Sequence, residues 1–289
     1  MAYDTSLAFD SVTVIESLAA GELKTGRDLV ETTLAPASCA DSGFVTELYE
    51  VDSRGELLGV LQAVLRTAKR YSRSPIIHIE THGDKKGLAL CSGEHVPWVD
   101  IAKHLAEINE ASRMNLLVVA ALCHGWNMIS ILRPTDRAPA FGIIGTNEAV
   151  IAIDLYRAMQ RFYTRLIAEP RDLRQAVSEA NDGAEYTEWT YYLVTAEIML
   201  CRIFRSYESG DSADETEEQR VSRIVAELAR ARGADLRQTM QWREQITREI
   251  RDYARWFGHY RTPFLMLDLF PENEARFPLR YEDCRPVAI

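Results

Sequence analysis

Hydrophobic residues along the chain fall into short continuous runs that alternate with longer segments of helical periodicity. Two runs, residues 75–83 and 116–125, are apolar and rich in β-branched side chains, which is typical of buried strands in a parallel sheet. Residues 57–70 carry apolar side chains every three or four positions, which predicts a helix lying on a sheet. This alternation predicts an α/β fold with a mainly parallel central sheet and helices on both faces. The same patterns predict strands at 11–16 and 44–51 and a helix at 20–34.

The pattern changes after about residue 181. Residues 187–207 read as one long helix, and the acidic, Gly- and Ser-containing run 208–218 reads as an exposed loop. Helices resume over 217–256, and the apolar run 262–270 is expected to add a late strand. The Ala-Pro-Ala-Ser sequence at 35–38 is expected to end the first helix. We therefore predict two parts, residues 1–182 with the sheet and a mainly helical region at 183–289.

Composition limits the classes of protein that the chain can belong to. With 289 residues, 47% of them hydrophobic, the chain can bury a full core. It has no apolar run of about 20 residues and no signal-peptide pattern, so we expect a cytoplasmic protein without a membrane segment. The formal net charge of −10 argues against a nucleic-acid surface, which needs clustered Lys and Arg.

The five cysteines show neither metal-ligand spacing nor a disulfide framework. We expect reduced thiols, no metal site and no cofactor. Cys39, Cys91, Cys201 and Cys284 are interpreted as structural.

The candidate reactive side chains stand at the ends of the two buried runs. One ends in His82-Gly83 and the other in Cys123, followed two residues later by Gly125. The carboxyl ends of parallel strands share one rim, where α/β sheets bind ligands, so an imidazole and a thiol are expected side by side there. A neighbouring imidazole can take the thiol proton, and only the thiolate is a strong nucleophile.

This pair of motifs resembles the catalytic dyad of the caspase-like cysteine peptidases and, among them, the CHAT domain family. The resemblance implies a three-layer sandwich and extends over roughly residues 9–182. It includes the segments that follow each motif, namely a hairpin at 87–93, a helix at 99–108, a strand at 140–145 and helical residues 162–180.

The resemblance implies a cysteine endopeptidase that acts on protein or peptide substrates through an acyl-thioester. Cys123 takes the role of nucleophile and His82 that of base and acid, while the amides of Gly83 and Cys123 form the oxyanion hole. His78, on the same strand face, competes with His82 as the base, although a packed core histidine is the favoured interpretation. His124 lies in the turn and is expected at the surface.

In the resembled family, the pocket for the side chain before the cut is built by three segments. They are the residue two before the Cys, the start of the first helix and the segment after the following strand. Lys24 or Arg27 would favour an acidic substrate side chain. Glu148 or Asp154 would favour a basic one, which is the preferred interpretation, although Ala121 departs from the Asp of the metacaspase branch. The candidate pocket residues are Ala121, Lys24, Arg27, Asn147, Glu148 and Asp154.

Bacterial proteins of the resembled type often act in antiphage defence and stay inactive until a signal arrives. The stretch 126–139, where many caspases are cut, has no long flexible acidic segment. Activation by a nucleotide signal or a partner protein is therefore expected. An ion-paired, solvated helix face is the other interpretation of the candidate sensor residues in the last third, which are Arg251, Arg255, Trp256, Tyr260 and Arg261.

Two other classes stay open. One is a catalytically silent scaffold or signal-binding module that keeps the fold. The other is a doubly wound nucleotide-binding enzyme, against which residues 16–22 offer a single glycine instead of a Gly-rich phosphate loop.

Overall fold

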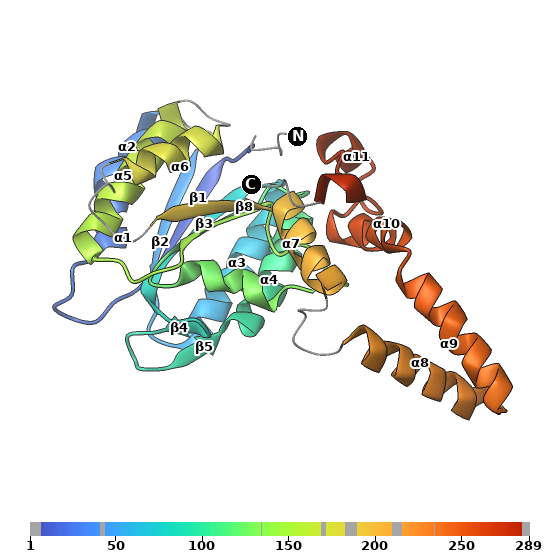
Figure 1. Ribbon diagram of the computed structural model, residues 1–289. Coiled ribbons are helices and arrows are strands. Elements are labelled where there is room, and N and C mark those ends of the chain that lie inside the picture. The colour runs from blue at the N-terminus through green and yellow to red at the C-terminus, as the bar shows by residue number, and fades with distance from the viewer. Residues whose placement is uncertain are drawn as a thin grey trace. The chain divides into compact units, whose positions relative to one another are not determined.

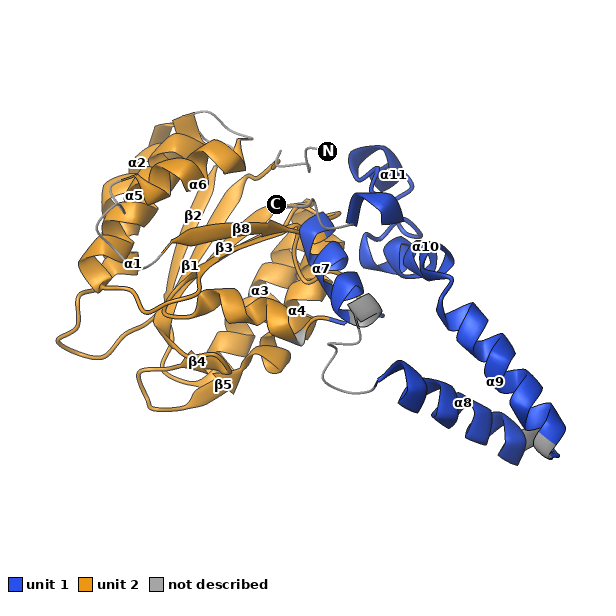
Figure 2. Ribbon diagram, in the orientation of Figure 1, with its two compact units in different colours: residues 1, 133–136, 197–289 blue, residues 2–132, 137–196 orange. Residues whose placement is uncertain are grey.

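The computed structural model describes residues 7–40, 44–133, 135–168, 172–182, 190–209, 216–233 and 235–284. These residues form two compact units (Figure 2), which are described one at a time. Residues 7–132 and 137–196 make up the sheet unit, and residues 133–136 and 197–284 make up the helical unit.

The sheet unit is built on a six-stranded sheet in the order β2-β1-β3-β6-β7-β8. All neighbouring pairs are parallel except β7 with β8, which is antiparallel. The predicted α/β fold with a mainly parallel sheet is therefore confirmed. The strands are β1 (Ser11–Ser17), β2 (Val45–Glu50), β3 (Pro75–Gly83), β6 (Leu117–Ala121), β7 (Gly142–Thr146) and β8 (Tyr191–Thr195).

Helices cover both faces of this sheet, as Figure 1 shows. On one face lie α3 (Arg54–Tyr71) and α4 (Trp98–Ala111), which contact each other. The predicted hairpin is present as β4 (Gly87–Ala89) and β5 (His95–Pro97), which extends from the end of β3. On the other face lie α1 (Thr25–Leu29), α2 (Ala35–Ala40), α5 (Ala152–Ala168) and α6 (Leu173–Asn181).

Local chemistry accounts for the position of α3. The hydroxyl of Ser53 accepts a hydrogen bond from the Glu56 N–H, and the Glu56 carboxylate accepts one from the Ser53 N–H, which together form a capping box. The helix ends at Ser72, whose φ is 53°. The buried residues of the helix follow the predicted stripe and are Leu57, Val60, Leu61, Val64 and Ala68.

The first helix continues past the point where the sequence was expected to end it. A π-helical segment at Val30–Leu34 joins α1 to α2, so helical structure runs on to Ala40. Pro36 follows this π-helical segment, in which the Ala35 N–H bonds the Val30 carbonyl five residues earlier, so the wider turn precedes the residue that lacks an N–H. The prediction of a stop at 35–38 is therefore wrong.

Two predictions about the last third are corrected. Residues 191–195 form strand β8, and the helix α7 (Ala196–Ser209) begins only after it, so 187–207 is not one helix. Residues 262–270 form no strand: they hold the end of α10 (Tyr253–Phe264) and the turns that follow it. Phe264, Leu265 and Met266 are fully buried, which explains why this run is apolar.

The helical unit contains a helical hairpin formed by α8 (Glu217–Arg232) and α9 (Leu236–Ile250). It also holds α10, the short α11 (Asn273–Arg276) and a 3₁₀ turn at Tyr281–Cys284. None of the helices in the described part of the chain has both the length and the apolar character needed to cross a bilayer.

The helical unit also overturns one prediction about cysteine. Cys201 on α7 and Cys284 in the last 3₁₀ turn form a disulfide between residues 83 positions apart. Both are buried beside an aromatic cluster in which Phe204 packs against Phe257 and Tyr281. The expectation of reduced thiols throughout is therefore wrong for this pair, while Cys39, Cys91 and Cys123 are free.

Candidate functional site

The two predicted motifs lie at the ends of neighbouring strands. Strands β3 and β6 are parallel, and their pairing runs from Ile76 opposite Leu117 to Glu80 opposite Ala121. His82 and Cys123 each come two residues after this last pair, His82 near the end of β3 and Cys123 in the turn that follows β6. The imidazole and the thiol are thus carried to the same rim of the sheet.

Gly83 makes the closest contact between these two strand ends. A Cβ built on Gly83 would lie 2.1 Å from Leu122 Cδ1 and 2.9 Å from the carbonyl oxygen of Cys123. Only glycine allows so close an approach of the two main chains. The Asp84 N–H donates to Gly87 O at 3.0 Å, and such bonded pairs alternate with unbonded pairs in an antiparallel ladder. The N–H of Gly83 therefore points away from β4.

The reactive atoms themselves have other partners. The half-buried Cys123 Sγ accepts a hydrogen bond from the Val150 N–H at 3.4 Å and lies 3.9 Å from Val150 O. The exposed His82 imidazole places Nε2 2.6 Å from Glu22 Oε1. Within the described residues, no hydrogen bond joins the thiol to the imidazole. The structure brings the two strand ends together without that bond.

The turn after Cys123 is fixed by main-chain packing. A Cβ on Gly125 would lie 2.6 Å from the Ala120 carbonyl oxygen, so glycine is needed there. His124 adopts a left-handed conformation with φ of 58°, and its Nδ1 lies 2.8 Å from Asn147 O. Since Asn147 follows β7, this contact ties the turn to the segment that also carries Val150. His124 is half-buried, not fully at the surface as expected.

His78 is a core residue, as the favoured interpretation held. It is fully buried, with Nδ1 3.2 Å from the Tyr163 hydroxyl and Nε2 3.1 Å from Glu80 Oε2. Burial raises the pKa of the Glu80 carboxyl above its ordinary value. Because both of its nitrogens are occupied inside the core, His78 cannot serve as a base at the rim.

Glu22 is a site residue that the sequence did not reveal. It lies in the loop between β1 and α1, where its Oε2 accepts a hydrogen bond from the Ala19 N–H at 2.5 Å. This bond, followed by the one to His82, lowers the pKa of Glu22. The sequence predicts helical structure from residue 20, whereas α1 begins only at Thr25, and an exposed glutamate in a loop gives no pattern to detect.

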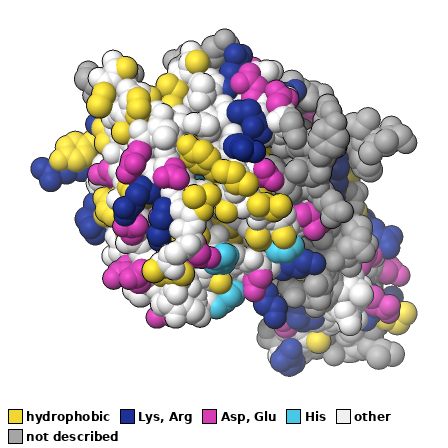
Figure 3. Space-filling model, turned by 90° about the vertical axis from the view of Figure 1, so that its left-hand side faces the viewer, with side chains coloured by type: hydrophobic (Ala, Val, Ile, Leu, Met, Phe, Trp, Pro, Cys, Tyr) yellow, Lys and Arg dark blue, Asp and Glu magenta, His cyan; other side chains and the backbone are white. Residues whose placement is uncertain are grey.

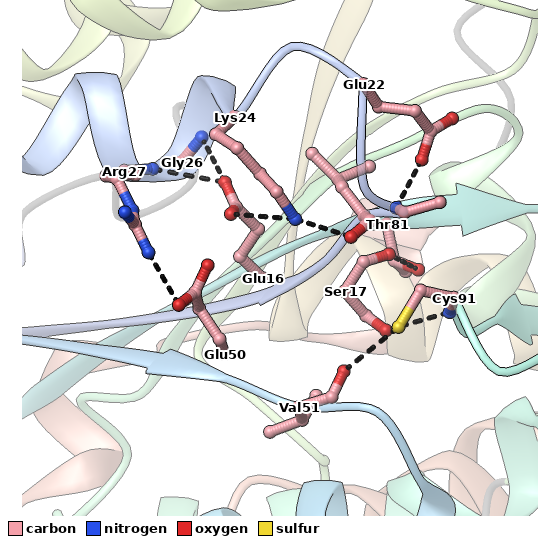
Figure 4. Close-up of polar contacts among 12 residues, drawn as sticks. Glu16, Ser17, Glu22, Lys24, Gly26, Arg27, Glu50, Val51, Thr81 and Cys91 are labelled. Atoms are coloured by element: carbon pink, nitrogen blue, oxygen red, sulfur yellow. Dashed lines mark hydrogen bonds and ion pairs between the residues drawn. The ribbon is translucent and has the colours of Figure 1, made fainter.

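The predicted pocket residues near the first helix are paired with glutamates (Figure 4). Lys24 Nζ lies 3.8 Å from Glu16 Oε2, and the Arg27 guanidinium lies 2.6 Å from Glu50 Oε2. The Glu16 carboxylate also accepts hydrogen bonds from the amides of Gly26 and Arg27, at 2.9 and 3.1 Å. A carboxylate therefore occupies the N–H groups that a nucleotide phosphate would need in the doubly wound alternative.

The other predicted pocket residues are in β6, in the segment after β7 and at the start of α5. Ala121 is buried in β6, two positions before the thiol. Asn147 and Glu148 are exposed, and their carbonyl oxygens accept from His124. Asp154 lies in the first turn of α5 and is half-buried. The structure thus brings the segment after β7 to the thiol and the loop after β1 to the imidazole.

Exposed apolar residues directly follow, in the sequence, the residues that contact the imidazole and the thiol. Leu23 directly follows Glu22, and Ile151 directly follows Val150; they are 45% and 65% exposed. Ile153, also exposed, is on the same segment. Figure 3 shows one face of the molecule on which apolar side chains gather beside histidines.

The predicted sensor residues are in the helical unit. Arg251 pairs with Glu217 at 2.9 Å, and Arg261 pairs with Glu274 at 3.0 Å, so two of the three arginines already have carboxylate partners. Trp256 stacks on Tyr260, with 6.1 Å between ring centroids. Arg255 is exposed on α10.

A shallow groove of about 460 Å³ lies nearby on α9. It is lined by Arg243, Glu244, Thr247, Arg248 and Arg251.

His, Cys, Asp and Glu side chains nowhere gather in a group of three or more that would hold a metal ion, as far as the described residues extend. No protein-family model matches the chain, and no curated protein matches it. The class that fold and site define is an α/β protein with a mainly parallel six-stranded sheet and a helical C-terminal region.

Proposed function

We propose that this protein is a caspase-like cysteine endopeptidase of the CHAT type, with Cys123 as nucleophile and His82 as general base and acid. The observation that carries the proposal is the register of β3 and β6. His82 and Cys123 follow its last pair, Glu80 with Ala121, by two residues each, and the close approach of Gly83 to the Cys123 carbonyl supports placing them at one rim.

The proposed reaction needs a proton acceptor for the thiol and donors for the developing oxyanion. His82 takes the Cys123 proton, the thiolate attacks the peptide carbonyl, and the imidazolium gives its proton to the leaving amine. Water then hydrolyses the acyl-thioester. The amides of Gly83 and Cys123 are proposed as oxyanion donors, which is supported by a Gly83 N–H that points away from β4.

The substrate is proposed to be a protein or peptide that lies across this rim. Exposed Leu23 and Ile151, which follow Glu22 and Val150 in the sequence, are suited to contact apolar parts of a peptide. Because Lys24 and Arg27 are already paired with carboxylates, a basic side chain before the cut is favoured over an acidic one. Glu148 and Asp154 are the proposed acceptors, with Ala121 and Asn147 completing the pocket.

Regulation by a bound signal is part of the proposal. We place the enzyme in the cytoplasm of a bacterium as an antiphage defence effector that a nucleotide or partner protein switches on. The arginine-lined groove on α9, together with Arg255, Trp256, Tyr260 and Arg261 of α10, is the proposed receiving surface. The carboxylate partners of Arg251 and Arg261 would have to exchange for the anionic signal.

The proposal is tested by mapping new peptide N-termini in a bacterial lysate by mass spectrometry. Wild type and Cys123→Ala are compared, each with and without extract from phage-infected cells. Cuts made only by wild type are expected, with Lys or Arg before the cut, and a requirement for the extract would reveal the signal. Identical N-termini from both proteins under every condition would refute the peptidase.

A catalytically silent scaffold is the second candidate, favoured by the absence of a hydrogen bond between thiol and imidazole in the described residues. Cys91 offers a matched control because it is a free, half-buried cysteine like Cys123, and its thiol donates to Asp52 Oδ1 at 3.0 Å. Iodoacetamide should label Cys123 faster than Cys91 in a peptidase. Equal labelling would favour the scaffold.

A further inference from the structure

The strongest polar contact of the His82 side chain is with a residue 60 positions earlier in the chain. His82 Nε2 and Glu22 Oε1 are 2.6 Å apart, a short distance typical of a charge-assisted hydrogen bond. Neither motif that identified the dyad includes Glu22.

The loop around Glu22 fixes the carboxylate in place. The Glu22 N–H donates to the Ala19 carbonyl at 3.2 Å, while the Ala19 N–H donates to Glu22 Oε2 at 2.5 Å. Gly21, with φ of 95°, allows this tight turn. One carboxylate oxygen is thus held by the loop, and the other is presented to the imidazole.

This contact determines which ring nitrogen carries the proton. An ionised carboxylate only accepts hydrogen bonds, and the Ala19 N–H keeps the pKa of Glu22 low. Nε2 of a neutral His82 must therefore be the donor, which leaves Nδ1 as the basic nitrogen. Within the described residues Nδ1 has no hydrogen-bond partner.

We propose that Glu22 is a positioning residue that holds His82 as the Nε2–H tautomer, with Nδ1 ready to accept the proton of Cys123. The inference rests on the function proposed above and adds a third member to its dyad. In the proposed step the S–H bond of Cys123 breaks, an N–H bond forms at Nδ1, and the imidazolium stays paired with the Glu22 carboxylate. The Nδ1 proton later passes to the leaving amine, so charge and protons balance.

Two other charged residues, Lys24 and Asp84, have identified interactions near Glu22 and His82. Lys24 interacts with the Glu22 carboxylate and is itself 3.8 Å from Glu16. Asp84, two residues after His82, is 3.3 Å from His95 Nε2 and accepts from the amides of Lys86 and Gly87. Among these groups, Glu22 is the one in direct contact with the His82 imidazole.

The test measures iodoacetamide labelling of Cys123 by mass spectrometry between pH 5.5 and 9.5, with Cys91 as internal reference. This readout needs no knowledge of the natural substrate. Glu22→Gln keeps the size of the side chain and removes its charge. We expect labelling of Cys123 to fall about tenfold near pH 6.5 and to match wild type near pH 9.5, which lies above the ordinary pKa of about 8.5 for cysteine thiols in general.

Matched variants separate the possible outcomes. Glu31→Gln, an exposed change in the π-helical segment that follows α1, should follow the wild-type profile. A loss in Glu22→Gln that is equal at every pH, or no loss at all, would overturn the positioning role while leaving the dyad intact. If wild type and His82→Ala share one profile, the dyad itself fails, and with it both proposals.

Discussion

His78 and Glu80 form a buried hydrogen-bonded pair on one face of β3, with 3.1 Å between Nε2 and Oε2. Glu80 Oε1, the other oxygen of that carboxylate, is buried and has no hydrogen-bond partner in the described residues. Burial raises the pKa of Glu80, and the charges of Glu16 and Asp28 add to this, while His78 acts in the opposite direction. The core beneath the strand ends therefore holds a carboxyl group that resists ionisation.

This raised pKa predicts a defined dependence of stability on pH. The native state holds the Glu80 proton more tightly than the unfolded chain, so the stability due to this proton is complete below the ordinary pKa of 4.5. It is lost as pH rises from there through the raised value. Relative to wild type, Glu80→Gln should therefore become more stable as pH increases over this window, in urea unfolding followed by circular dichroism. A stability difference that stays constant with pH, as expected for the exposed Glu31→Gln, would contradict the assignment.

The contact of Gly83 with Cys123 predicts a steric effect. In Gly83→Ala the new Cβ meets the Cys123 carbonyl at 2.9 Å, and a main-chain atom cannot move away as easily as the Leu122 side chain. We expect a loss of about 1–3 kcal/mol in the free energy of unfolding, as for an overpacked site, together with slower cleavage.

Gly59→Ala is the matched control for that change. Gly59 is on α3 with no atom within 4 Å of the added Cβ, so this variant should gain about 0.5–1 kcal/mol in stability. If Gly83→Ala were as stable as wild type, the close approach of the two strand ends would be wrong.

The sequence predicted those strands and helices whose hydrophobic pattern directly reflects which of their faces are buried. β3 and β6 are buried on both faces, so they appear as continuous apolar runs, and the helix α3 shows its stripe because one face meets water. β8 was missed because Tyr191–Thr195 passes directly into the apolar helix α7 at Ala196, with no turn residue between them. An apolar run without a boundary does not show where strand ends and helix begins.

Other features depend on contacts that no local pattern encodes. Cys201 and Cys284 are 83 residues apart, so their spacing gave no sign of a bond. The position of Glu22 against His82 depends on a turn at Gly21 and on strand order, both of which are set by the tertiary fold. The motifs that contain His82 and Cys123 could be recognised because each stands at the end of an apolar strand.

The disulfide of the helical unit predicts a stability that depends on redox conditions. Breaking the Cys201–Cys284 bond should cost about 2–4 kcal/mol, because it releases a long closed loop in the unfolded chain. Cys201→Ala, Cys284→Ala and the double variant should lose similar amounts, since each removes the same bond. Urea unfolding with and without dithiothreitol measures this: reductant should lower wild type to the level of the variants. Additive losses in the double variant would indicate that the two cysteines act separately.

The hairpin of α8 and α9 predicts local unfolding that leaves the sheet unit unaffected. Val221 and Val225 of α8 pack with Ile246 and Ile250 of α9 in a small cluster of their own. Ile246→Ala opens a cavity there and should cost about 2–4 kcal/mol, a large share of what so few buried side chains contribute.

Hydrogen exchange followed by mass spectrometry measures this effect directly. Amides of α8 and α9 should exchange faster in Ile246→Ala, while those of β3 and β6 keep their protection. Met240→Ala is the control, because that side chain is 63% exposed and its loss should change stability by less than about 0.5 kcal/mol. Faster exchange in β3 and β6 as well would contradict local unfolding. It would mean that a cavity in the hairpin cluster destabilises both units together.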